Sequence, residues 1–103
     1  MAYFHLKLVP PRPRFPHDAN ELEKAAFDRH AAYWREKAAA RTAIAVGPVF
    51  EGEGAWGMAV VEVATFAEAE ALAGEDPVIR AGLGFRFDVS PMPSLILRPD
   101  LAG

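Results

Sequence analysis

The stretch DRHAAYWREK, residues 28–37, contains a histidine in a setting that packing alone does not require. Histidine is the side chain that most readily takes up and releases a proton near neutral pH. If the stretch is helical, with about 100° per residue, His30 lies near the middle of an apolar arc of about 160°. The arc consists of Ala26, Phe27, His30, Ala31, Tyr33, Trp34 and Ala38. The ring is either a core histidine bonded to main-chain carbonyls or a group that transfers protons, and the spacing leaves both interpretations open.

An aspartate, a loop arginine and two aromatic residues also allow both a structural and a functional interpretation. Asp76 opens the sequence DPVI, and an aspartate before a proline is typical of a helix N-cap, which by itself accounts for the residue. Arg12 lies between two prolines, whose rigidity lowers the entropy lost when its side chain is aimed at a target. Phe15 and Trp34 are aromatic side chains of a kind that more often pack than bind a substrate.

Several kinds of chemistry are excluded or unsupported. The chain has no cysteine, so disulfides, thiolate nucleophiles and zinc held by cysteine are excluded. His5 and His17 have no partner at a metal-binding spacing, and we expect neither a metal nor another cofactor. The glycines form no phosphate-binding loop. No serine or lysine stands out as a nucleophile, which disfavours an acyl-enzyme.

Charge and hydropathy narrow the partners and the compartment. The chain has 11 basic and 14 acidic residues, a net charge of −3, and no basic stripe, so a nucleic acid is not expected as a partner. It lacks the roughly 20 consecutive apolar residues of a membrane-spanning helix. The N-terminal MAYFHLKLVPPRPRF has no apolar core of a signal peptide. We therefore expect a cytoplasmic protein.

The hydrophobic pattern predicts a single domain over residues 1–103, with an extended loop at residues 10–19. Asn20 and Glu23 form a capping-box pattern at the start of the first helix. The expected elements are a strand at 2–10, a helix at 20–39, strands at 42–50 and 55–65, a helix at 66–75, a helical turn at 76–83 and a strand at 84–92. The proline-rich residues 91–103 predict no regular element beyond that strand. The order β-α-β-β-α-β is ferredoxin-like, an α+β fold with an antiparallel sheet and both helices on one face.

The third predicted strand is apolar on both sides, interrupted only by Glu62. Met58, Val60 and Ala64 point to one side, and Ala59, Val61 and Val63 point to the other. A strand of this kind is covered on both faces. The helices cover one face, and the chain has no further element for the second. We therefore predict a homodimer, or an assembly of dimers, in which the sheets pack through the faces carrying the residues of MAVVEVA.

An ordered set of segments identifies the chain with a known family. YFHLKLVPPRPRFPHD, HAAYW, VGPV, DPVIRAG and PMP follow one another in this order. From Tyr3 to Pro93 the chain resembles the YCII-related family of small bacterial proteins. The resemblance implies a ferredoxin-like fold of the dimeric α/β-barrel kind. It also implies an enzyme in which a histidine and an aspartate share a pocket, and their positions match His30 and Asp76.

A His–Asp pair in a pocket suits acid–base catalysis. The carboxylate fixes the tautomer of the imidazole, and a well-placed acid or base contributes about 10² to 10⁴ in rate. A rim of Arg12, Phe15 and Trp34 would suit a small anionic or aromatic substrate. The expected reaction is a proton abstraction or an elimination, as in an isomerase, a lyase or a dehalogenase-like enzyme. The alternative is a non-catalytic module that binds a small ligand or assists another protein, in which His30 and Asp76 are structural.

The chain departs from the family pattern at two places. KAAARTAIAV, at the end of the first helix, has no glycine where relatives commonly carry one, so a different turn into the next strand is expected. Arg14 stands where relatives often have a small polar residue, which would change the charge preference of the pocket.

Overall fold

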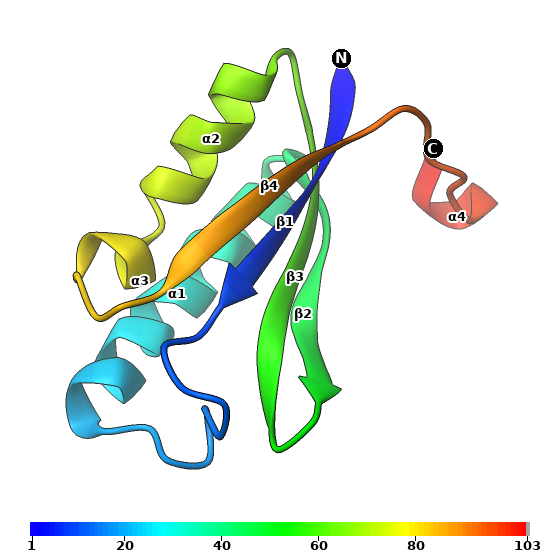
Figure 1. Ribbon diagram of the computed structural model, residues 1–103. Helices are drawn as coiled ribbons and strands as arrows, with labels where there is room; N and C mark the ends of the chain where they lie inside the picture. The colour runs from blue at the N-terminus through cyan, green and yellow to red at the C-terminus, as the bar shows by residue number, and fades with distance from the viewer. Residues whose placement is uncertain (103) are drawn as a thin grey trace.

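The computed structural model, described over residues 1–102, is one antiparallel sheet with three of its helices, α1, α2 and α3, on a single face (Figure 1). The strands lie in the order β2-β3-β1-β4. They are β1 (Ala2–Val9), β2 (Ala43–Glu51), β3 (Gly54–Val63) and β4 (Arg86–Met92). The helices are α1 (Glu21–Ala39), α2 (Phe66–Gly74), α3 (Pro77–Arg80) and α4 (Pro99–Ala102). This element order confirms the predicted ferredoxin-like fold.

The core lies between the sheet and helices α1 and α2. Alternate residues of β1 and β3 point toward the helices, which is the two-residue period of a strand with one face buried. Leu6 and Val61 are fully buried at the centre of this layer, and Ala69 of α2 packs against them. None of the helices within residues 1–102 combines the length and apolar character needed to cross a membrane.

Helix α1 begins and ends with standard capping interactions. Asn20 accepts a hydrogen bond from the Glu23 main-chain N–H at 2.9 Å, and the Glu23 carboxylate accepts one from the Asn20 N–H at 3.0 Å. The predicted capping box is therefore confirmed. At the other end the N–H of Thr42 donates to the Lys37 carbonyl and that of Arg41 donates to Ala38, which is a Schellman motif. Arg41 has φ of 66°, the left-handed conformation that glycine adopts without strain.

We expect Arg41→Gly to stabilise the protein by about 0.5–1 kcal/mol, because a side chain in this conformation brings its Cβ too close to the backbone. For a domain of this size that corresponds to a rise in Tm of about 4 °C. Thermal unfolding followed by circular dichroism measures it. Ala40→Gly is the matched control, since Ala40 has an ordinary helical φ of −79° and a glycine there should not stabilise. A fall in Tm for Arg41→Gly would contradict the expectation.

One predicted strand end was wrong, and one short helix was not predicted. Strand β3 ends at Val63, so Ala64 does not extend its face, because Thr65 turns the chain and its hydroxyl accepts from the Glu68 N–H as the cap of α2. The short helix α4 forms where no regular element was predicted. Pro99 is compatible with it because the first helical position needs no N–H donor.

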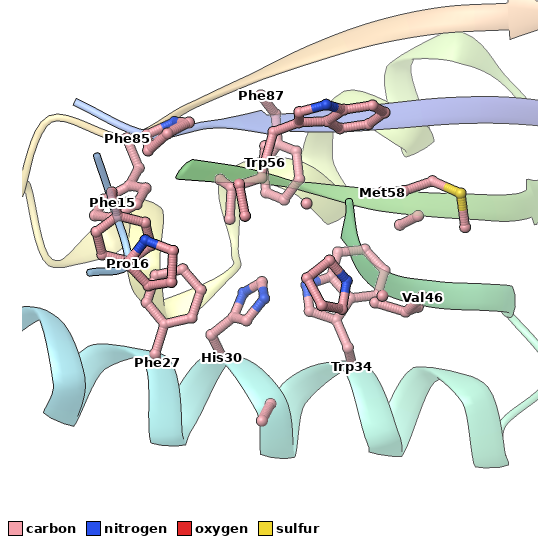
Figure 2. Close-up of a pocket in the computed structure, with 18 of the residues that line it drawn as sticks. Phe15, Pro16, Phe27, His30, Trp34, Val46, Trp56, Met58, Phe85 and Phe87 are labelled. Atoms are coloured by element: carbon pink, nitrogen blue, oxygen red, sulfur yellow. The ribbon is translucent and has the colours of Figure 1, made fainter. Parts of the chain in front are cut away.

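The side of the sheet turned away from α1, α2 and α3 is here named the open face. Its residues are Tyr3, His5 and Lys7 of β1 and Trp56, Met58, Val60 and Glu62 of β3. The Lys7 ammonium lies 4.7 Å from the centre of the Trp56 ring, and the His5 ring meets the same indole edge to face. Trp56 and Met58 also line a cavity that extends to α1 (Figure 2). These side chains are partly buried, and the predicted second copy that would cover them stays a prediction.

Candidate active site

His30 and Asp76 are in direct contact although 46 positions separate them in the sequence. His30 projects from the middle of α1, and Asp76 immediately precedes α3, which packs beside α1. The His30 Nδ1 atom lies 2.7 Å from Asp76 Oδ2. The structure thus brings together the two residues that the family resemblance had paired.

Asp76 is fully buried and accepts hydrogen bonds at both oxygens. Oδ2 accepts from the Trp34 indole N–H at 2.7 Å as well as from His30, and Oδ1 accepts from the main-chain N–H of Val78 at 2.9 Å. The last contact makes Asp76 the N-cap of α3. The helix-cap interpretation and the His-partner interpretation are therefore both correct for this residue.

The Trp34 contact with Asp76 was missed by sequence reasoning. Trp34 follows His30 by one helical turn, and residues four apart lie on one face of a helix. This spacing lets the two ring N–H groups reach one acceptor. The four-residue separation was therefore the signal in the sequence that could have predicted the contact of Trp34 with Asp76. The sequence predicts that Trp34 packs in the core or contacts a substrate; the packing is confirmed, and the substrate contact stays a prediction.

The hydrogen-bond network assigns the proton of the neutral His30 ring to Nδ1. A carboxylate only accepts hydrogen bonds, so the nitrogen that faces Asp76 must donate. Nε2, on the far side of the ring, is then left with its lone pair. The His30 side chain is 15% exposed, and Figure 2 shows the ring pointing from α1 into a cavity.

The cavity has a volume of about 730 Å³ and lies between α1, the loop before it and the β2–β3 hairpin. Aromatic side chains dominate the wall around His30 (Figure 2). The aromatic residues that line the cavity are Phe15, Phe27, Trp34, Trp56, Phe85 and Phe87. The cationic side chains that line it, Lys24 and Arg35, are exposed and belong to its rim. The interior is therefore shaped for a small ring compound, and its wall contains two groups that can accept a proton, the His30 ring and the Glu23 carboxylate, of which Glu23 is already paired with Arg12.

Phe15 is a buried part of this wall. Its ring lies 5.0 Å from the centres of both the Phe27 and the Phe85 rings. The Ala55 N–H donates to the Phe15 carbonyl at 2.8 Å, which ties the loop to β3. A Cβ on Gly54 would collide with the main-chain oxygens of Pro13 and Phe15, so only glycine permits this close approach. The predicted contact of Phe15 with a substrate stays a prediction, and its place in the wall is compatible with it.

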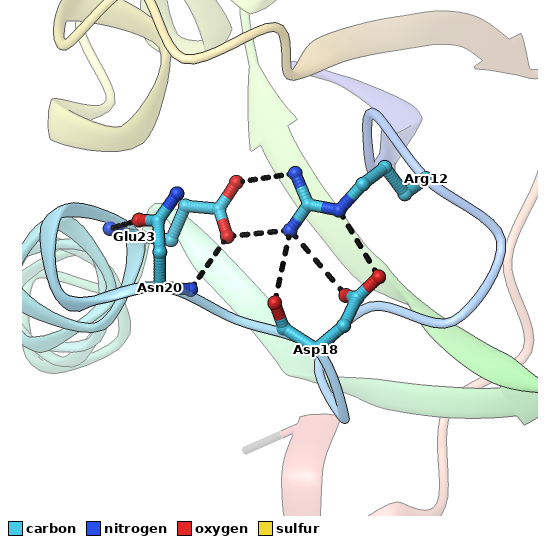
Figure 3. Close-up of polar contacts among 4 residues, drawn as sticks. All are labelled: Arg12, Asp18, Asn20 and Glu23. Carbon is cyan, nitrogen blue, oxygen red and sulfur yellow. Dashed lines mark hydrogen bonds and ion pairs between the residues drawn. The ribbon is translucent and has the colours of Figure 1, made fainter.

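Arg12 does not line the aromatic cavity. Its guanidinium forms two hydrogen bonds with the Glu23 carboxylate, at 2.6 and 2.9 Å, and pairs with Asp18 at 3.1 Å (Figure 3). Binding a substrate, as predicted for Arg12, would require it to leave these partners. Arg14 is exposed and also outside the cavity lining, so it does not set the charge there.

Glu23 is a buried residue that the capping-box interpretation only partly explained. Its carboxylate is 2% exposed and holds Arg12 as well as the cap. The hydrogen bonds from Arg12, and then from the Asn20 N–H, lower the pKa of Glu23, so it stays ionised. The same pairing raises the pKa of Arg12. Together they fix the loop at residues 10–19 against the first turn of α1.

Tyr33 stays protonated near neutral pH, and its side chain does not line the cavity. Its hydroxyl donates to the Leu72 carbonyl at 2.6 Å and so joins α1 to α2. Burial, with the nearby negative charges of Glu75, Asp76 and Glu36, raises the pKa of Tyr33 to about 12.

Within residues 1–102 no three acidic or histidine side chains converge as a metal site.

Comparison with known proteins places this geometry in a family. The family model described as YCII-related domain matches residues 4–93. Among solved structures, the chain is similar to 5-chloro-2-hydroxyhydroquinone dehydrochlorinase from Burkholderia phenoliruptrix, determined in complex with 2,5-dihydroxybenzoquinone. That structure is 20% identical, and the match covers 84% of this chain and 90% of the other with a TM-score of 0.55, which shows a shared fold. Comparison with curated protein sequences gives no match. The match over residues 4–93 is decisive, and the chain belongs to the YCII-related domain family.

Proposed function

We propose that this protein is an enzyme that uses His30 as a general base and acid, without a cofactor, on a small ring substrate held in the aromatic cavity. The observation that carries the proposal is the 2.7 Å contact between His30 Nδ1 and the buried Asp76, which leaves Nε2 to the cavity. A histidine whose second nitrogen is held by a carboxylate has a fixed tautomer and orientation.

In the proposed reaction, Nε2 removes a proton from an acidic hydroxyl or an activated carbon of the substrate. Asp76 stabilises the imidazolium that forms, while Trp34 and Val78 keep the carboxylate in place. In an elimination, the proton is taken from the activated carbon, the electron pair of that C–H bond forms a new double bond to the neighbouring carbon, and a halide leaves that neighbouring carbon with its bonding pair. In an isomerisation, the imidazolium returns the proton to a different atom of the substrate.

The substrate class follows from the wall and from the fold relative. Aromatic rings favour a flat ring ligand, because stacked and edge-to-face contacts add to the burial of apolar surface. Lys24 and Arg35 at the rim favour one that carries negative charge or becomes negative on losing a proton. The dehydrochlorinase of the same fold was solved with a dihydroxylated quinone, which supports a hydroxylated or halogenated ring.

The competing proposal is a module that binds a similar ligand without turnover. The contacts of Asp76 with Trp34 and Val78 favour it, since both are sufficient to keep a buried aspartate for structural reasons. Only catalysis requires that Nε2 of His30 face the ligand.

Two probes test the proposal on the unmodified protein. 2,5-Dihydroxybenzoquinone should shift the NMR signals of the His30 ring, and 5-chloro-2-hydroxyhydroquinone should release chloride faster than in buffer alone. Binding at His30 without chloride release or exchange of ring protons with D₂O would support the binding module. Shifts confined to His5 or His17 would remove the proposed site.

We also propose that the protein is a cytoplasmic homodimer, or an assembly of dimers, formed through the open face. Met58 and Val60 lie on this face, opposite Lys7 and His5 of β1. A half-apolar sheet face in a small chain is most simply covered by the same face of a second copy. Light scattering should give at least twice the chain mass at micromolar concentration, and a stable monomer there would contradict the proposal.

A further inference from the structure

The C-terminal arm, defined as residues 93–102, carries apolar side chains that are left in solvent. Ile96 is 97% exposed and Leu101 is 54% exposed. Figure 1 shows the arm leaving β4 and running on the side of the sheet opposite to α1, α2 and α3. Within residues 1–102, α4 makes no extensive contact with another helix or strand. Single exposed apolar residues are common, but this group sits on a projecting segment and marks a contact surface.

The arm is apolar on both of its sides. Successive side chains of an extended segment point in opposite directions. Leu95 and Leu97 are partly buried, whereas Ile96 between them is exposed. One side of the arm therefore rests toward its own chain, and the other side presents Ile96 to a partner.

Two prolines bracket the apolar segment and keep it extended. Pro93 and Pro99 each fix φ and lack an N–H donor. A segment that is already stiff loses little conformational freedom when it docks. The missing donors also limit further strand pairing, so the arm is suited to one defined contact rather than to open-ended aggregation.

We propose that, beside the contact between the two open faces, the arm of one copy packs at the margin of the open face of the second copy, with Ile96 at the centre of this arm contact. This inference rests on the proposed homodimer. The arm is continuous with the open face, because Met92 at the end of β4 pairs with Tyr3 at the edge of that face. The face also carries charges of both signs, Lys7 and Glu62, which is compatible with a surface that complements itself about a two-fold axis.

The first test is the oligomeric state of Ile96→Asp, measured by analytical ultracentrifugation. Burying an isoleucine stabilises a contact strongly enough that its loss should raise the dimer Kd at least about tenfold. Because Ile96 is almost fully exposed in one copy, the variant should keep its fold and its NMR spectrum outside the arm. Leu22→Asp is the matched control, since Leu22 is 70% exposed on α1 and its change should leave the Kd unaltered.

The second test locates the arm. The chain has no cysteine, so Ile96→Cys carries a single nitroxide label. Labelled chain is mixed with unlabelled ¹⁵N chain, and any broadening of the ¹⁵N signals then comes from another copy. We expect broadening of the amides around Trp56, Met58 and Val60.

The outcomes separate this inference from the proposed homodimer. A monomeric wild type overturns both. A dimer whose Kd is the same in Ile96→Asp overturns the arm contact alone. Broadening restricted to α1 or α2 also overturns it, since the arm would then dock on the wrong face.

Discussion

Replacing Asp76 with alanine is expected to lower the free energy of unfolding by about 3–5 kcal/mol. The change leaves three donors without an acceptor, the partly buried N–H of His30 and the buried N–H groups of Trp34 and Val78. Each stranded donor costs about 1–3 kcal/mol, and partial rearrangement keeps the total below the simple sum. This is a large part of the stability of a domain of this size. Urea unfolding followed by circular dichroism gives the difference.

Two further variants define the effect of Asp76. Asp28→Ala is the matched control, because Asp28 is exposed on α1 and its loss should change stability by less than about 0.5 kcal/mol. Asp76→Asn should fall between alanine and wild type, since its oxygen can still accept one donor while its amide hydrogens oppose another. An Asp76→Ala protein as stable as Asp28→Ala would show that the three contacts are unimportant.

Replacing His30 with asparagine is expected to reduce turnover at least about 100-fold, the lower end of the contribution of a general base. The asparagine amide lies near the position of Nδ1 and can still donate to Asp76, but nothing replaces Nε2 in the cavity. The fold should therefore remain close to wild type in stability. Chloride release from 5-chloro-2-hydroxyhydroquinone and thermal unfolding measure the two effects separately.

His30→Leu completes the comparison. Leucine removes the donor to Asp76 as well as Nε2, so stability should fall by about 1–3 kcal/mol in addition to the loss of turnover. A melt of this variant alone does not distinguish a catalytic from a structural histidine, because the bond to Asp76 exists in both cases. His5→Asn, on the open face, controls for histidine loss. Turnover retained in His30→Asn would remove His30 from the proposed mechanism.

The fold was predictable because its signals are local. The strand alternation of β1 and β3, the Asn20–Glu23 capping box and the proline at the start of α3 each act within a few residues. The error at the end of β3 has a local cause as well: the strand was predicted to run to Thr65, whose hydroxyl instead caps α2.

The site was only partly predictable. The apolar arc of α1 singled out His30, but the partner came from the family resemblance, since no local rule states which residue lies 46 positions away in contact. The Arg12 ion pair with Glu23 was missed for the same reason. Flanking prolines indicate that the side chain of a loop arginine is held in one direction. The sequence does not say whether a substrate or a buried carboxylate lies in that direction.

The separate anchoring of the Phe15 loop has an evolutionary consequence. Gly54 and the Arg12–Glu23 pair hold this loop, whereas α1 and α3 hold His30 and Asp76. Mutations at Phe15 can therefore reshape the cavity while the proton-transfer pair keeps its geometry. A gene duplicate could acquire a new ligand through one side chain and retain its inherited chemistry, so members of one lineage can diverge in what they accept before they diverge in what they do.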